Sequence, residues 1–201
     1  KIYYDTTVTR LTKAEIRKKA IDSVQLYTSG SNTEKFNGKF RYSKYIGVID
    51  DADRSISSNL TSVMMRKDFY PQINSASFYE ICYQNEFDSD CDDENVVFSS
   101  GFTVQQYPTY TVYMEDRDGK VALYRLDSVT GEKITIDPEI GTVDYAHGEF
   151  KIDSLTIIKG TYSDNRIELR ARPRYNDIVA KREVYLDVDI ANSKFTAYQE
   201  S

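Results

Sequence analysis

The stretch that decides the fold runs from Phe40 to Pro71 and reads FRYSKYIGVIDDADRSISSNLTSVMMRKDFYP. In its first part, apolar side chains recur at helical spacing, at Tyr42, Tyr45, Ile46, Ile49 and Ile56. In its last part, Val63 and Met65 alternate with Met64 and Arg66, which is the spacing of a strand. A helix followed by a strand is therefore expected, and the stretch carries no pattern typical of catalysis.

An acidic segment, Asp50-Asp51-Ala52-Asp53-Arg54, separates the two periodicities. We predict a helix over about 41–49, a bend built by Asp50, Asp51, Asp53 and Arg54, and a strand over about 61–67. Three carboxylates could bind a hard cation, but aspartates that cap free N–H groups, neutralised by Arg54, are the favoured interpretation. The apolar members of both patterns should be buried together as the best-packed part of the chain: Ile46, Ile49, Ile56, Val63 and Met65.

The residues before this stretch predict a short strand and a capped helix. Residues 1–9 are β-like, and Thr12-Lys13-Ala14-Glu15 is a capping box. Ser29-Gly30-Ser31-Asn32 should end the helix. Its apolar face is expected to comprise Ile16, Ala20, Ile21 and Val24.

After Pro71 the pattern changes to short strands and turns. Asp116-Arg117-Asp118-Gly119 is a strong hairpin signal, and Thr130-Gly131 marks another turn. Strands are expected over about 77–83, 96–104, 109–115, 120–126, 133–136, 149–158, 166–172, 184–190 and 194–198, with a helical turn at 176–181. The fold class is therefore α+β: a small helix-strand unit, residues 1–71, followed by a β-rich antiparallel domain, residues 72–201.

The composition is typical of a folded globular chain. Of 201 residues, 40% are apolar and 29% are charged, and no apolar run approaches the length of a membrane span. The formal net charge of -6 argues against a protein that mainly coats nucleic acid. The 17 tyrosines, with no tryptophan, favour strands and interfaces. Lys1 in place of a methionine predicts a fragment or a processed product.

No residue pattern predicts an active site, a metal or a cofactor. Cys82 and Cys91 fit neither a disulfide framework nor zinc spacing, so free thiols are expected. Asp88-Ser89-Asp90-Cys91-Asp92 has the alternating acids of a calcium loop without its glycine and closing glutamate, which favours an acidic loop over a divalent-ion site. His147, the single histidine, is expected in a turn. A glycosidase-like carboxylate pair stays open, because 32 acidic residues always bring some pair together.

Two oppositely charged regions form the candidate interface. Basic side chains should share one strand face beside Tyr175, at Arg166, Arg170, Arg172 and Arg174. No Lys or Arg occurs between Lys67 and Arg117, and acidic residues accumulate there, among them Asp88, Asp90 and Asp92. A basic face can bind nucleic acid. An acidic protein surface, on a second copy or on another protein, is the favoured partner.

Several of these motifs resemble the baseplate wedge ring protein of contractile-tailed bacteriophages. The resemblance rests on Val48 to Asp53, Ser55, Ile56 and Thr61 to Arg66, where an aliphatic-Asp-Asp-Ala-Asp segment precedes a Val/Met-rich strand. Shorter matches follow in the same order, at Asp116-Arg117-Asp118, at 143–152 and at Arg172-Pro173-Arg174-Tyr175. The acidic insertion at 86–94 departs from the family pattern.

The resemblance implies the C-terminal portion of a structural virion protein, without catalysis or cofactor. Such proteins form dimers that link into a ring around the tail tube and hold other wedge proteins. The implied location is the virion tail baseplate after assembly in the host cytoplasm, with no nucleic-acid or membrane partner. Two other classes stay open: a β-rich receptor-binding or adhesion module of a virion, with aromatic rings exposed in a cleft, and a hydrolase with a carboxylate pair in a pocket.

Overall fold

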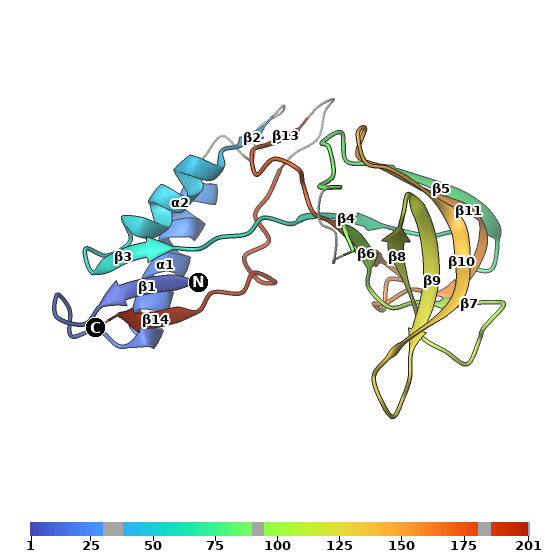
Figure 1. The fold of residues 1–201 in the computed structure, drawn as a ribbon, viewed down its shortest axis with the longest axis horizontal. Coiled ribbons are helices and arrows are strands. Elements are labelled where there is room, and N and C mark those ends of the chain that lie inside the picture. The colour runs from blue at the N-terminus through green and yellow to red at the C-terminus, as the bar shows by residue number, and fades with distance from the viewer. Residues whose placement is uncertain (30–37, 90–94, 181–185, 201) are drawn as a thin grey trace. The chain divides into compact units, whose positions relative to one another are not determined.

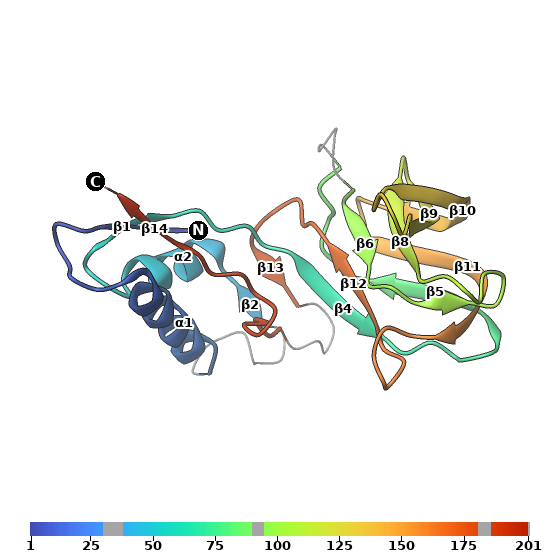
Figure 2. The same ribbon diagram turned by 90° about the horizontal axis from the view of Figure 1, so that it is seen from below.

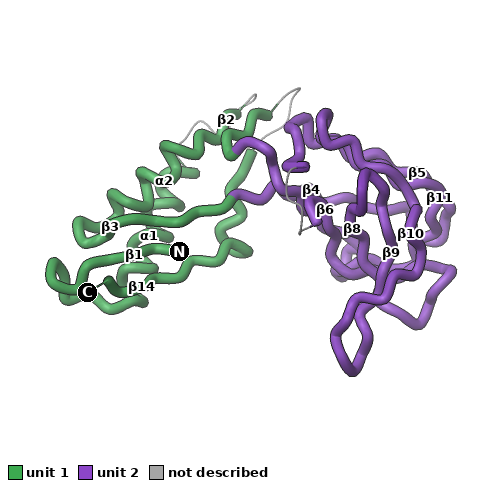
Figure 3. Tube along the Cα trace, viewed as in Figure 1, with its two compact units in different colours: residues 1–62, 176–201 green, residues 63–175 purple. Residues whose placement is uncertain are grey.

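The computed structural model describes residues 1–29, 38–89, 95–180 and 186–200. The chain divides into two compact units, unit 1 with residues 1–62 and 176–201, and unit 2 with residues 63–175 (Figure 3). This division differs from the expected boundary at Pro71, because the last strand of the chain pairs with the first. That 1–71 and 72–201 fold as separate domains stays a prediction.

Unit 1 packs two helices on one face of a small sheet (Figures 1 and 2). Its helices are α1 (Lys13–Ser29) and α2 (Tyr42–Asp50). Its strands are β1 (Ile2–Asp5), β2 (Lys39–Phe40), β3 (Ile56–Asn59), β13 (Ile178–Val179) and β14 (Ala197–Glu200). The sheet has the order β14-β1-β3, with β1 parallel to β14 and antiparallel to β3, and β2 pairs separately with β13.

Both helices begin where side chains satisfy free N–H groups. The predicted capping box of α1 is confirmed: Glu15 N–H donates to Thr12 Oγ1 at 3.3 Å, and Thr12 N–H donates to Glu15 Oε2 at 2.7 Å. Helix α2 is capped from far along the chain, because Tyr42 N–H donates to Asp177 Oδ1 at 2.8 Å. Arg41 also forms an ion pair with Asp177, so the C-terminal segment fixes the start of α2.

The expected core of the 40–71 stretch is only partly correct. Ile49 and Ile56 are buried, but Ile46 is half-buried, and Val63 and Met65 belong to unit 2. The strand expected at 61–67 is β4, which begins only at Met65, and β3 precedes it. None of the largest fully buried side chains of the described residues comes from this stretch, so the prediction that it is the best-packed part is wrong.

Two predictions near the C-terminus are also wrong. Residues 186–189 form no strand, although their apolar and acidic residues alternate; Val184 lies outside the described residues. The Asp189 carboxylate accepts hydrogen bonds from Asn192 N–H at 3.1 Å and from Asn192 Nδ2 at 2.8 Å, and this local turn competes with strand pairing. Of the helical turn expected at 176–181, the described residues 176–180 form no helix, and two of them make up strand β13 (Ile178–Val179).

Tyr4 offers a direct test of the unit 1 core. Its side chain is fully buried on β1, and its hydroxyl has no hydrogen-bond partner in the described part of the chain. Tyr4→Phe should therefore leave stability unchanged or raise it by about 1 kcal/mol, because an unpaired buried hydroxyl is costly. Urea unfolding measures this, and a loss of stability would indicate that the hydroxyl has a partner in solution.

Unit 2 is a curved antiparallel sheet (Figure 1). The strands follow the order β4-β12-β6-β8-β9-β10-β11-β5, and β7 also pairs with β11. Their bounds are β4 (Met65–Phe69), β5 (Ala76–Cys82), β6 (Val97–Ser99), β7 (Thr103–Val104), β8 (Val112–Arg117), β9 (Lys120–Leu126), β10 (Lys133–Asp144), β11 (Glu149–Lys159) and β12 (Ile167–Ala171). The fold is α+β as expected, with strands prevailing.

Turn residues divide this sheet much as the sequence predicts. Asp118 and Gly119 have φ values of 49° and 79°, the two positive values of a tight hairpin turn between β8 and β9. The strand expected over 96–104 is interrupted at Gly101, where an added Cβ would lie 2.6 Å from Thr111 Cγ2. Glycine therefore permits a close approach here, and the strand splits into β6 and β7.

The two end strands of the sheet meet through side chains. Lys67 of β4 donates from Nζ to the carbonyl of Cys82 of β5 at 2.6 Å, and the rings of Phe69 and Tyr79 lie 5.5 Å apart. Burial lowers the pKa of Lys67. These contacts close the curve of the sheet where no backbone ladder joins β4 and β5 in the described pairings.

Candidate interaction surface

The predicted arginine face lies on the outward side of β12. Ile167, Leu169 and Ala171 of this strand are fully buried, so residues 166, 168, 170 and 172 alternate with them toward the other face. Register places Arg170 opposite Arg66 on β4 and opposite Phe98 on β6. The outward side chains of three neighbouring strands therefore share this surface.

A buried carboxylate organises these arginines. Glu168 is only 2% exposed; its Oε1 lies 2.8 Å from Arg66 Nη2 and its Oε2 lies 3.1 Å from Arg170 Nη2. Tyr162 donates its hydroxyl hydrogen to Oε1 at 2.6 Å, which raises the pKa of the phenol. We call Glu168, Arg66, Arg170 and Tyr162 the Glu168 cluster. Because its charges are paired, the arginines are held in place by the unit itself.

Arg166 extends the cluster at one end. Its guanidinium lies 4.2 Å from the centre of the Tyr162 ring, and its Nη1 lies 3.4 Å from Asp68 Oδ2. Asp68 also accepts from Arg66 Nε at 2.8 Å. The sequence places Glu168 in the basic stripe, but strand alternation alone cannot show that it is buried, or that β4 supplies Arg66 and Asp68.

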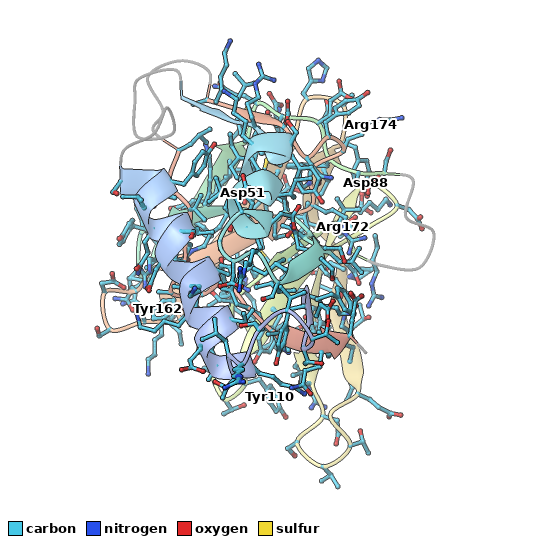
Figure 4. The ribbon with its side chains drawn as sticks, turned by 90° about the vertical axis from the view of Figure 1, so that its left-hand side faces the viewer. Asp51, Asp88, Tyr110, Tyr162, Arg172 and Arg174 are labelled. Carbon is cyan, nitrogen blue, oxygen red and sulfur yellow. The ribbon has the colours of Figure 1, made fainter. Side chains whose placement is uncertain are left out.

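The other end of the arginine face touches the start of the acidic segment. Asp88 N–H donates to the carbonyl of Arg172 at 3.0 Å, and Arg174 N–H donates to the carbonyl of Glu86 at 2.9 Å. Arg174 Nε lies 3.9 Å from Glu86 Oε2. Figure 4 labels Asp88, Arg172 and Arg174, and shows Tyr162 well apart from Arg174. The two candidate patches are thus neighbours within one unit.

Of the remaining predicted interface residues, only Tyr175 lies in the described part of the chain. Tyr175 is 63% exposed and follows directly after Arg174. Asp90 and Asp92 lie outside the described residues. Cys82 is a free, half-buried thiol, as expected; Cys91 is also outside the described part.

A groove of about 600 Å³ lies beside these residues. Glu86, Asp144, Lys151 and Arg174 line it together with Phe87 and Tyr145. Asp144 accepts hydrogen bonds from the backbone and ring of His147, and these lower its pKa. A general acid of a glycosidase needs a raised pKa, so the lowered pKa of Asp144 does not suit that role. Of the two aromatic residues named in its lining, Phe87 is buried and Tyr145 is half-buried, so the groove presents an aromatic ring only in part.

Two further buried carboxylates were not anticipated from the sequence. Glu115 pairs with Arg117 Nη2 at 2.6 Å and with Lys133. Asp116 accepts from the N–H groups of Val96 and Val97, each at 2.7 Å. In the sequence, Asp116-Arg117 signals only a hairpin turn. The groups that pair with the Glu115 and Asp116 carboxylates include residues far away in the sequence, so local patterns could not show that these carboxylates are buried and paired.

Hydrogen bonds and an ion pair hold the acidic bend, and the cation beside Asp53 is Lys19 rather than the expected Arg54. Asp53 forms an ion pair with Lys19 of α1 at 2.6 Å, while Arg54 is exposed. Ser55 N–H and Oγ also donate to Asp53, and Asp50 accepts from Asn59 Nδ2 at 2.7 Å. Asp51 is the C-cap residue of α2. In the part of the chain that is described, no group of three or more His, Cys, Asp or Glu side chains could hold a metal ion.

Asp53 should make unit 1 sensitive to acid. The hydrogen bonds from Lys19 and Ser55 lower its pKa to about 2, below the unfolded value of about 3.9. A carboxyl group with a lowered folded pKa contributes stability above the unfolded pKa, and loses it as pH falls through the folded pKa. Asp53→Asn should therefore reduce stability at pH 6 and flatten its decline between about pH 4 and pH 2. Thermal unfolding across this range checks the prediction, and identical pH profiles would contradict it.

His147 should contribute little to the fold. Its side chain is exposed in the turn 145–148, which ends at Gly148 with a φ of 64°, and its Nδ1 is 2.8 Å from Asp144 Oδ2. This contact raises the pKa of His147, so any stabilisation exists at low pH and is lost as pH rises through the folded pKa. His147→Ala should leave folding and assembly intact, which circular dichroism and light scattering can check. Abolished assembly would assign this residue a role at an interface.

The family comparison concerns mainly unit 1. The model of the family described as baseplate structural protein gp6, C-terminal domain III, matches residues 1–68. No curated protein matches the chain. Among the described residues, no helix is long and apolar enough to cross a membrane.

This match confirms the resemblance found in the sequence. Over residues 1–68 the chain is similar to a structural protein of a baseplate, and this similarity supports a structural role in a phage tail baseplate. The matched segment runs from β1 into β4, while most of unit 2 lies outside it.

Proposed function

We propose that this chain is a self-associating scaffold of the baseplate wedge, whose dimers link into a ring and hold other baseplate proteins. The family match over residues 1–68 carries the proposal. A location in the baseplate would bring such a scaffold into contact with the other baseplate proteins that it is proposed to hold. A β-rich receptor-binding module is the second candidate, and the half-buried Tyr145 in the groove of unit 2 is the observation that favours it.

The surface proposed for the contact is the exposed end of the arginine face, at Arg174 and Tyr175. An exposed tyrosine beside a partly exposed arginine is typical of an interface hot spot. The ion pair between Arg174 and Glu86 is long, at 3.9 Å, and both side chains are well exposed, so the Arg174 guanidinium is accessible to a further acidic group. An acidic stretch of another baseplate protein is proposed as the occupant of this surface, and its charge would govern the encounter rate and the register of the contact.

Light scattering over a range of concentrations tests the scaffold. The mass of the wild-type protein should rise with concentration, and a mass that stays monomeric throughout would reject self-association. The variant Arg174→Glu with Tyr175→Ser should bind other baseplate proteins more weakly at low salt, and the difference should shrink as salt is added. Lys18→Glu is the control, because it reverses one exposed charge on α1. Binding equal to wild type would reject the surface while leaving self-association untouched.

Arg170 is unsuitable for this test. A glutamate at position 170 would lie beside the buried Glu168 carboxylate, so loss of assembly could reflect misfolding. Arg174 is the better choice because its side chain is 40% exposed and its ion pair with Glu86, at 3.9 Å, joins two exposed residues.

A further inference from the structure

The two units carry opposite balances of charge. Unit 2, residues 63–175, holds 20 acidic and 12 basic residues, whereas the rest of the chain holds 12 acidic and 14 basic residues. A charge balance of this kind acts on association with partners rather than on the fold. An exposed cationic surface on unit 1 therefore has its complement on unit 2 of a second copy.

Three exposed cations near the start of α1 form no ion pair with any carboxylate of the described residues. Arg10 precedes the helix, and Lys13 and Arg17 lie one turn apart within it. The next cation, Lys18, differs from them because it pairs with Asp22 at 2.7 Å. We call Arg10, Lys13 and Arg17 the basic patch.

The position of the basic patch is unfavourable for the helix itself. The N-terminal end of a helix carries partial positive charge, so cations close to it lower helix stability rather than raise it. Lys13 is the first residue of α1, and Arg17 follows one turn later. Because these side chains neither favour the helix nor pair within their own unit, an acidic partner outside the unit would give their charges a role.

Acidic side chains gather at one end of the unit 2 sheet. Asp118 lies in the turn between β8 and β9, and Asp144 is the last residue of β10 before the turn into β11. Tyr145 connects these turns to the segment that follows β5. Its hydroxyl accepts from Gly119 N–H at 3.0 Å, and its carbonyl accepts from Phe87 N–H at 2.8 Å.

The two neighbours of Phe87 bring further carboxylates to this end. We call the four acidic residues together the acidic end: Glu86, Asp88, Asp118 and Asp144. Three of them are exposed, and Asp88 is half-buried. Two cations, Lys151 and Arg174, line the same groove as Glu86 and Asp144, so the carboxylates outnumber the cations here.

We propose that the basic patch of one copy binds the acidic end of unit 2 in a second copy. Such a contact joins two different surfaces, so each pair leaves one basic patch and one acidic end available for further copies, and repetition can close a ring. The proposal rests on the self-association proposed above and names the surfaces that meet. Nucleic acid is a poorer occupant of the basic patch, because the chain carries a formal net charge of -6.

Crosslinking in a mixture of isotopes locates the contact. Equal amounts of unlabelled and heavy-isotope-labelled protein are treated with a carbodiimide, which joins a lysine amine to a carboxylate that it touches. We expect links from Lys13 to the acidic end that combine one light and one heavy peptide. Links from Lys13 only to other carboxylates, links only within one copy, or no link from Lys13 would each overturn the proposal.

Charge reversal tests the basic patch by light scattering. The double variant Lys13→Glu, Arg17→Glu should weaken self-association about tenfold or more at low salt, and the difference from wild type should shrink as salt is added. Carboxylates at the N-terminal end of α1 favour the helix, so misfolding would not explain this loss. Lys18→Glu is the matched control and should associate as wild type does, because Lys18 already pairs with Asp22.

Mixing two variants tests whether the two surfaces meet. Glu86→Lys with Asp118→Asn weakens the acidic end, and asparagine tolerates the positive φ of position 118. This variant should associate weakly by itself but should regain association when mixed with the double variant of the basic patch; a mixture without recovery would overturn the contact. A wild-type protein that stays monomeric would reject the proposed self-association itself, whereas equal association of wild type and the basic-patch variant would overturn only this contact.

Discussion

Replacing Glu168 with alanine should lower the free energy of unfolding of unit 2 by about 3–5 kcal/mol, the usual cost of breaking a buried ion pair from one side. The carboxylate is 2% exposed and accepts from Arg66, Arg170 and Tyr162. Its removal would take one carboxylate partner from Arg66, whose hydrogen bonds to Asp68 would remain. Arg170 would face a space that no longer holds a negative charge.

Hydrogen exchange followed by mass spectrometry gives a measurement specific to this unit. Peptides that cover 166–172 and 112–126 should lose protection in Glu168→Ala, while peptides from α1 should keep it. Glu80→Ala is the matched control: Glu80 is exposed and pairs with Lys151 at 3.3 Å, so its loss should cost less than about 1 kcal/mol. Equal effects of the two substitutions would show that the Glu168 cluster is no more important than a surface pair.

Local signals in the sequence predicted the turns and caps correctly. The capping box of Thr12 and Glu15 and the tight turn at Asp118 and Gly119 each depend on residues close in sequence. Such motifs specify backbone geometry before any tertiary contact forms. The helix over 41–49 was found for the same reason, since its apolar spacing is internal to the segment.

Long-range pairing explains what the sequence did not reveal. The alternation in 184–190 is as regular as that of a true strand, yet within the described part of the chain no strand pairs with residues 186–189, and Asp189 forms a turn instead. Conversely, Ile178 and Val179 become a strand because β2 lies beside them. Strand propensity describes a fit to a partner, so it cannot decide between these cases when the partner is unknown.

The charges of the candidate surface also depend on long-range strand pairing that the sequence does not reveal. Within β12, Glu168 and Arg170 alternate with the buried Ile167, Leu169 and Ala171, which is the spacing that the sequence predicts for a strand. The pairing of β12 with β4 brings Arg66 and Asp68 onto that face, and burial of Glu168 converts an apparent basic stripe into an internally paired cluster. Charge counted along a sequence therefore overestimates what remains for a partner, and Arg174 and Tyr175 become the more suitable positions to test.

Ile49→Ala should lower the free energy of unfolding of unit 1 by about 2–5 kcal/mol, as expected when a buried isoleucine leaves a cavity. Ile49 is 3% exposed on the inward side of α2. Ile46 lies one turn earlier on the same helix but is only half-buried. Ile46→Ala removes the same atoms from a less enclosed site, so it should cost distinctly less and serves as the matched control.

Hydrogen exchange of peptides within α2 distinguishes these two outcomes. Because α2 packs on β3 and on α1, Ile49→Ala should reduce protection in α1 and β3 as well, whereas Ile46→Ala should act mainly within α2. Protection of β8 and β9 should stay at the wild-type level in both variants, because these strands have a core of their own in unit 2. A loss for Ile49→Ala no larger than that for Ile46→Ala would mean that α2 is held by its cap at Asp177 rather than by its buried face.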